Sequence, residues 1–287
     1  MNAENEGRGS ARTTGNSTWG SLLVLALLAA PGMAAQSGDA KKTDAPKPAT
    51  AQAEYSKKLD EIVKRLEAAQ DELRKKLDAA ANDDERQTLI EKWPGAALRA
   101  EFKALAQEAK GTDVAAQAWI RVARLALDSE DEKASADAQL AVKTLLSDSL
   151  TSPSIAALPF MLGGVLSMEE AQKAWSDLLA KSPHKAVQAA ALYMQVLVVA
   201  QKEEASGQED PELHKLYERL AKDFGEAKLP DSEKTFKALA EGWLFARDNL
   251  RVGKLVPDFE ATDENGAKFK LSDYKGKVVV LDFWGHW

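Results

Sequence analysis

Apolar side chains recur at helical spacing along most of this chain, from about residue 53 to residue 249. In the first stretch they follow alternating steps of four and three residues, with Lys, Glu and Arg between them. That spacing places them on one face of a single long helix, as in a coiled-coil seam. We expect the helices that cover this seam at residues 85–93 and 97–110, on either side of Pro94 and Gly95. The seam consists of Tyr55, Leu59, Ile62, Leu66, Ala69, Leu73 and Leu77.

Turn-forming residues divide the rest of this region into helical hairpins. Gly111 ends one helix, and Thr112 or Asp113 caps the next. The later breaks are Ser-Pro, Asp-Pro and Pro-Asp pairs, which stop a helix and start a new one. The expected pairs are 115–127 with 134–147, 154–166 with 168–180, and 185–201 with 211–224, followed by 232–249.

The sequence therefore predicts a mostly α fold, a helical-repeat or helical-bundle domain over residues 53–250. It resembles tetratricopeptide-type repeats, although its spacing drifts from their strict 34-residue period. Two functions stay open for it. The helices could form a concave surface that binds a protein partner, or they could be a packing domain without a ligand.

The N-terminus is typical of an export signal. Arg8 and Arg12 precede an apolar run, residues 22–30, and small residues follow it. Cleavage is expected after Ala34 or Ala35, so that residues 1–35 are a signal peptide. The alternative is an uncleaved membrane anchor that begins at Trp19. Residues 36–52 are rich in Ala, Lys, Pro and Asp without apolar periodicity, which predicts a disordered linker.

Composition excludes several kinds of site. The formal charge of −7 argues against a nucleic-acid partner, because phosphate binding needs a concentrated Lys/Arg face. The chain contains no cysteine, so sulfur ligands for a metal are excluded. The three histidines, His184, His214 and His286, have no metal-ligand spacing. We expect no metal and no cofactor, and contact with a membrane only through an uncleaved leader.

The sequence changes character at Arg251. A polar turn, residues 263–266, precedes a short alternating segment, residues 267–271, and a second turn follows at residues 272–277. Residues 278–284 are then an almost continuous apolar run rich in Val. Such a run, bounded by Gly276 and Gly285, predicts a central strand that is buried on both faces of an α/β sheet.

Asp282 is the one charged residue in that run. A carboxylate buried without a partner is costly, and its usual response is to keep its proton near neutral pH. Such a group can exchange a proton with a neighbour and act as an acid–base catalyst. The alternative is an Asp at an exposed strand end, or one that is bonded to a backbone donor. Physical reasoning alone does not separate the two.

Residues 251–287 resemble the start of the redoxin family (AhpC/TSA type), in the branch of exported thioredoxin-like thiol–disulfide oxidoreductases. Gly285 and His286 depart mildly from the family pattern. In that family a Cys-x-x-Cys motif follows directly, and this chain ends before it. The matching residues are Gly253, Pro257-Asp258-Phe259, Gly266, Leu271-Ser272-Asp273-Tyr274, Gly276-Lys277, Val280-Leu281-Asp282-Phe283-Trp284 and Trp287.

The resemblance implies an enzyme whose full-length form exchanges electrons with protein disulfides or thiols in the periplasm or cell envelope. It implies that Asp282 transfers a proton at the resolving cysteine, and it places Pro257, Phe283, Trp284 and Trp287 near the active site. This chain, without cysteines, is expected to be inactive. The alternatives are a peroxiredoxin-type antioxidant peroxidase, and a helical-repeat adaptor that carries a non-catalytic redoxin-like domain.

Overall fold

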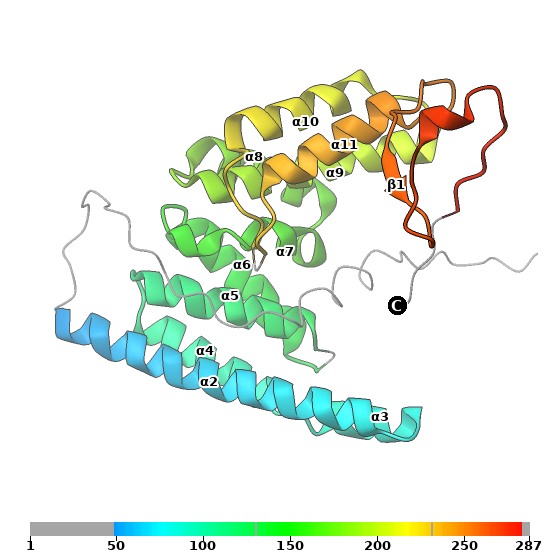
Figure 1. Ribbon diagram of the computed structural model, residues 1–287. Coiled ribbons are helices and arrows are strands. Elements are labelled where there is room, and N and C mark those ends of the chain that lie inside the picture. The colour runs from blue at the N-terminus through cyan, green and yellow to red at the C-terminus, as the bar shows by residue number, and fades with distance from the viewer. Residues whose placement is uncertain (1–48, 130, 231, 283–287) are drawn as a thin grey trace, which may run out of the picture.

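The computed structural model describes residues 49–129, 131–230 and 232–282 (Figure 1). Helices occupy this part of the chain up to residue 249, and a small two-stranded sheet follows them. The predicted export signal and most of the linker lie outside the described residues. The helices are α2 (Ala49–Ala79), α3 (Asp83–Glu91), α4 (Gly95–Glu108), α5 (Asp113–Leu127), α6 (Ala134–Asp148), α7 (Leu158–Val165), α8 (Met168–Lys181), α9 (Lys185–Ser206), α10 (Pro211–Phe224) and α11 (Phe236–Asn249), with a 3₁₀ turn η1 (Pro153–Ile155).

The predicted long helix is confirmed as α2. Its seam residues Leu59, Ile62 and Leu66 are buried against α4 and α5, whereas Leu73 and Leu77 are only half-buried. The far end of α2 contacts α3, a short helix that buries none of its residues. The expected covering helices are therefore present, but the seam is a closed interface only along its first half.

Helix α5 lies in the middle of the first hydrophobic core. It packs against α4 and α6 on its flanks and also contacts α2 and α7. Ala116, Ala118 and Ala123 are at most 1% exposed, and their small side chains allow these neighbours to approach closely. The predicted pairing of this helix with α6 is confirmed.

Helix α9 joins this core to a second one. Val187 and Ala191 pack into the first core, whereas Leu192 and Val196 pack into the second. The second core lies between α9, α10 and α11 and is centred on buried Leu, Tyr and Phe side chains. Figure 1 shows the result, a stack of helices that runs from α2 at one end to α10 and α11 at the other.

Two predicted helices begin or divide differently in the structure. Residues 154–166 form η1 and α7 rather than one helix, because Pro159 has no N–H to bond to the preceding turn and is accepted only in a first turn. Helix α11 begins at Phe236 rather than 232, since the Thr235 hydroxyl accepts the N–H of Ala238 and caps it there. The predicted cap at Thr112 is confirmed, and Asp113 instead binds the hydroxyls of Ser152 and Ser154.

A buried ion-pair network links α4 to α6. Arg99 is 2% exposed, and it donates from Nε to Asp137 at 2.9 Å and from Nη2 to Asp131 at 2.7 Å. Lys103 binds the other oxygen of Asp137 at 2.6 Å. The hydrogen bond from Arg99 is the main cause that lowers the pKa of Asp131. The two carboxylates therefore share one guanidinium, and Asp137 has Lys103 as a second cationic partner.

We predict that Arg99→Ala destabilises the protein by about 2–4 kcal/mol, because it removes the buried guanidinium that Asp131 and Asp137 share and leaves Asp137 with Lys103 alone. The exposed pair of Arg65 with Glu101 provides the matched control, and Arg65→Ala should change stability little. Urea unfolding followed by circular dichroism measures both. Equal effects of the two substitutions would contradict the importance of the buried network.

A second charged cluster lies where α9, α10 and α11 meet. Glu203, near the end of α9, accepts a hydrogen bond from Arg247 Nη1 at 2.5 Å and another from the backbone N–H of Asp210 at 2.7 Å. Asp210 in turn caps α10. The bond from Arg247 is the main cause that lowers the pKa of Glu203 from 4.5 to about 2. One carboxylate therefore contributes to the packing of three helices.

This shift predicts a pH dependence of stability. A carboxyl group whose folded pKa is depressed stabilises the fold above its unfolded pKa and loses that contribution as pH falls through the folded value. The loss from Glu203 should therefore occur between pH 4.5 and about 2. Glu203→Gln should be less stable than the parent at pH 7, and the gap should close across this window in urea-unfolding curves. The control is Glu204→Gln at the exposed neighbouring residue. Its plot of the free energy of unfolding against pH should run parallel to that of the parent.

Candidate functional site

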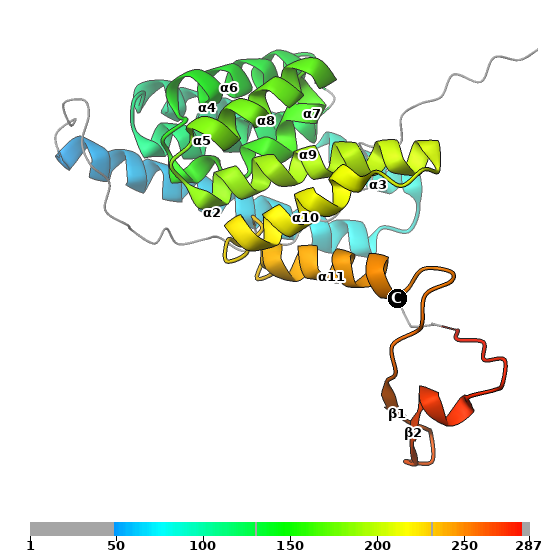
Figure 2. The same cartoon turned by 90° about the horizontal axis from the view of Figure 1, so that it is seen from above.

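The part of the chain that resembles a redoxin is described from Arg251 to Asp282, and we call residues 251–282 the C-terminal segment. It contains β1 (Glu260–Thr262), β2 (Lys268–Lys270) and a 3₁₀ turn η2 (Leu271–Tyr274). Figure 2 shows that it lies to one side of the helical stack, beyond the end of α11.

The two strands form an antiparallel hairpin. Ala261 pairs with Phe269 at the centre of the register, and an ion pair of 2.8 Å joins Lys270 to Glu260 across the strands. In the connecting loop the Asp263 carboxylate accepts the N–H groups of Asn265 and Ala267. Gly266 has a φ of 82°, which other residues rarely adopt. The predicted polar turn and the alternating segment after it are confirmed.

Asp258 ties the start of this hairpin to its end. Its carboxylate accepts both the N–H and the hydroxyl of Ser272, each at 2.8 Å, and the hydroxyl is the main cause that lowers its pKa. Leu271 also donates its N–H to the carbonyl of Phe259 at 3.1 Å. Asp258 and Ser272 both belong to the sequence motifs, but nothing in the sequence indicated that they bind each other. The half-buried Pro257 is held directly before this contact.

The second predicted turn, residues 272–277, is also confirmed. Tyr274 packs edge-on against Phe269 with ring centroids 6.1 Å apart, and Lys277 donates its N–H to the Tyr274 carbonyl at 3.0 Å. Gly276 takes a φ of 80° in this turn. Local hydrogen bonds hold the chain as far as Lys277, and none holds the described residues after it.

The predicted buried strand is wrong for the described residues 278–282, which have no regular structure. Val278 is 96% exposed and Val280 87% exposed. A central strand is held by strands on both of its sides, and the described residues contain only the β1–β2 pair, which does not include it. The apolar run is therefore present without the sheet that would bury it.

Asp282 is exposed in this structure, in contrast to the burial that a central strand would give it. It makes no hydrogen bond or ion pair with another described residue. Phe283, Trp284 and Trp287 lie outside the described residues. Of the five predicted site residues the structure describes only Pro257 and Asp282, and the catalytic role of Asp282 stays a prediction.

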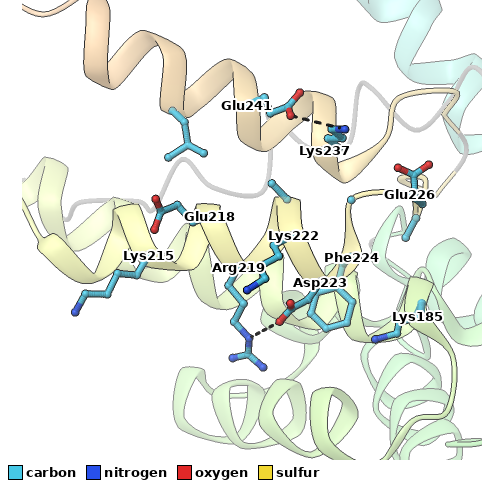
Figure 3. Close-up of a pocket in the computed structure, with 14 residues that line it drawn as sticks. Lys185, Lys215, Glu218, Arg219, Lys222, Asp223, Phe224, Glu226, Lys237 and Glu241 are labelled. Carbon is cyan, nitrogen blue, oxygen red and sulfur yellow. Dashed lines mark ion pairs between the residues drawn. The ribbon is translucent and has the colours of Figure 1, made fainter.

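A groove of about 980 Å³ provides the second candidate site, on the helical stack between α10, the start of α11 and the first residue of α9 (Figure 3). Its floor includes Phe224, with the Lys185 ammonium 4.8 Å above the ring centre. The lining carries charges of both signs, and ion pairs of 3.6 and 4.0 Å form within it, Arg219 with Asp223 and Lys237 with Glu241. The other charged residues of the lining are Lys215, Glu218, Lys222 and Glu226.

This groove is the feature that could serve the predicted partner-binding role of the helices. It favours no particular ligand, because cations and anions are interleaved and partly neutralise each other. Within the described ranges, no group of three or more His, Asp or Glu side chains is arranged to hold a metal ion. Among the same residues no helix combines the length and the apolarity that crossing a membrane requires.

Comparison with known proteins identifies the C-terminal segment. Residues 252–287 match the AhpC/TSA family. Over 49 residues the chain is 43% identical to the thiol-disulfide oxidoreductase ResA of Bacillus thuringiensis, a match that covers 17% of this chain and 28% of the relative. It is 56% identical over 38 residues to ResA of Geobacillus kaustophilus, covering 13% and 22%. No solved structure matches the chain significantly.

These matches show that the C-terminus of the chain is similar to the start of a thioredoxin-like redoxin domain, as the residues there predicted. The chain spans only 28% of the length of the first of these relatives. The family match begins at residue 252, after the helical stack, so the role of the stack is inferred from its structure.

We predict that the helical stack folds without the C-terminal segment. Both cores are built from residues between Leu59 and Ala240, so deletion of residues 252–287 should change the free energy of unfolding by less than ~0.5 kcal/mol. It should also improve solubility, because it removes the exposed Val run. Thermal melting followed by circular dichroism provides the measurement.

The matched control is a longer deletion, residues 236–287, which also removes α11. It should lower the melting temperature sharply, because Phe236 and Ala240 belong to the second core. Loss of cooperative melting in the shorter deletion would show that the C-terminal segment packs on the helices and that the boundary near residue 250 is wrong.

Proposed function

We propose that this chain is part of an exported thiol–disulfide oxidoreductase that exchanges electrons with protein thiols or disulfides. The observation that carries the proposal is the 56% identity over 38 residues to a thiol-disulfide oxidoreductase, located where the sequence motifs of a redoxin occur. The export signal predicted at residues 1–35 supports a periplasmic or cell-envelope location.

The proposed organisation has four parts: the signal peptide, a flexible linker from residue 36 that ends where α2 begins at Ala49, the helical domain up to residue 250 and the redoxin domain from 251. The helical domain is TPR-like in its succession of antiparallel helices. Its proposed role is to bind a protein partner or to hold the redoxin domain away from the membrane.

The chemistry needs two cysteines, which this chain does not contain. We propose that they follow Trp287 in the full protein. The first thiolate, activated at a helix N-terminus, attacks a substrate disulfide and forms a mixed disulfide. The second thiol gives up its proton and resolves it, so that the substrate leaves as a dithiol and the enzyme becomes a disulfide. Oxidation of a substrate dithiol is the reverse of these steps.

Asp282 is the residue of this chain with a proposed part in the reaction. With the strand 278–284 paired on both sides in a complete sheet, Asp282 would be buried next to the second cysteine. It would accept that thiol's proton as the thiolate forms. Its exposure in the present structure is what the unpaired strand entails and not a property of the assembled site.

The coding sequence after Trp287 separates the candidate functions directly. Two cysteines with two residues between them support an oxidoreductase. A single cysteine indicates a peroxidase, and the absence of cysteine indicates an adaptor with a non-catalytic redoxin-like domain. We expect the first outcome, because the Trp-rich end of this chain fits the Trp-Cys-x-x-Cys branch of the family.

We predict that Asp282→Asn in the full protein preserves the fold and lowers turnover by about ten-fold or more, as expected for loss of a positioned acid–base group. Insulin reduction measures turnover, and single-turnover kinetics should place the loss in resolution of the mixed disulfide rather than in the first attack. The matched control is Glu264→Gln, which removes one charge at the exposed hairpin loop and should leave turnover unchanged.

The 287-residue chain supplies the baseline for this assay and should match the uncatalysed rate with dithiothreitol. A rate above that background would refute the proposal that catalysis requires the cysteines. An unchanged resolution rate with a less stable fold would show that Asp282 is a structural residue only.

A further inference from the structure

The helical stack and the C-terminal segment meet at a cluster of four charged side chains, which we call the junction clamp: Glu203, Glu209, Arg247 and Arg251. We propose that this clamp fixes the direction in which the redoxin segment leaves the helical stack, with Arg251 and Glu203 as its positioning residues. This inference goes beyond the proposed oxidoreductase function and does not depend on it.

Arg251 makes the connection across the boundary. Its Nη2 lies 3.3 Å from Glu203 Oε1, and its Nη1 donates to Glu209 Oε1. Arg247, one helical turn earlier, binds the same two carboxylates, with Nη1 2.5 Å from Glu203 and Nη2 3.7 Å from Glu209. Arg247, near the end of α11, and Arg251, at the start of the C-terminal segment, thereby share the carboxylates of Glu203 and Glu209.

The glutamate side of the clamp is anchored in the helical stack. Glu203 is 14% exposed, and its second oxygen accepts the N–H of Asp210, the cap of α10. Gly207 ends α9 with a φ of 66° and turns the chain back toward that cap. The position of the Glu203 carboxylate is therefore fixed relative to α9 and α10.

The arginine side is anchored as well. The side chain of Arg247 is 8% exposed, and its guanidinium lies 4.9 Å from the ring centre of Trp243. Trp243 itself stacks on Tyr217 of α10, with centroids 4.0 Å apart and an angle of 15° between the rings. Arg247 is thus held by α11 and α10 together, and it gives Arg251 a fixed neighbour.

The chain beyond the clamp has no second attachment of this kind. No hydrogen bond or ion pair joins residues 252–282 to a helix within the described part of the chain. Val252 and Leu255 are fully or almost fully exposed, at 106% and 93%, and Gly253 takes a φ of 85° in the turn closed by the Lys254 N–H. The ion pairs of Arg251 are therefore the last contacts that can set the direction of the segment.

The absence of cysteine from the chain allows a direct measurement. Two substitutions, Lys222→Cys on α10 and Glu264→Cys at the hairpin loop, introduce the only labelling sites. Spin labels at these positions report the distribution of distances between the helical stack and the C-terminal segment, measured by pulsed electron paramagnetic resonance. The labelled parent should give a narrow distribution.

Arg251→Gln, placed in this labelled background, should widen the distribution about two-fold, toward that of a flexible linker. Because Arg251 is 39% exposed and lies outside both cores, the substitution should leave the melting temperature and helical circular dichroism unchanged. Glu203→Gln should widen the distribution too, but it should also lower the melting temperature. Salt at ~1 M, which screens exposed ion pairs, should widen the parent's distribution in the same direction.

The matched control is Lys254→Gln, which removes a positive charge three residues after Arg251. Lys254 forms no ion pair with another described residue. It should leave the distribution as narrow as the parent's. A parent distribution already as wide as that of Arg251→Gln would overturn the proposal, as would equal widening by Lys254→Gln. Neither outcome bears on the oxidoreductase function, because the measurement involves no redox chemistry.

Discussion

The packing of α5 against its neighbours is the interaction on which the rest of the helical stack depends. Three of its alanines, Ala116, Ala118 and Ala123, contribute almost no exposed surface, and they let α4 and α6 close on it from both sides. A larger side chain at any of them would have to displace a helix, because protein interiors contain few voids. With this contact in place, α9 extends the first core into the second. The junction with the redoxin segment is positioned at the far end of that continuous core.

Most of the helical stack was predictable because its boundaries are set by local chemistry. A hydroxyl or carboxylate at Thr112 and Asp210 accepts the free N–H groups of the next helix, and that requirement is visible in the sequence. The division of residues 154–166 was missed although its cause, Pro159, is equally local. What periodicity does not give is the extent of burial. Leu73 and Leu77 continue the α2 seam in perfect register, yet they stay half-exposed because the short helix α3 covers them poorly.

The C-terminal segment divides in the same way between local and distant causes. Asp263 and Gly266 specify a hairpin loop whose bonds all lie within five residues, so the sequence predicts it and the structure contains it. The Asp258–Ser272 contact spans 14 residues and had no sequence signal beyond the motifs that contain it. Burial of Asp282 requires strands from elsewhere in a sheet. Its exposure follows from the lack of such neighbouring strands among the described residues.

A fixed junction also distinguishes the two roles open for the helical domain. A domain that only spaces the redox centre from a membrane gains nothing from a defined orientation, since the flexible linker predicted at residues 36–52 already supplies distance. A domain that presents a bound protein to the redox centre does need one, because reacting groups must meet within a narrow range of positions. Four charged side chains crossed at the boundary, two of them at most 14% exposed, are a costly arrangement for a spacer. The junction clamp therefore favours the partner-binding role for the helices.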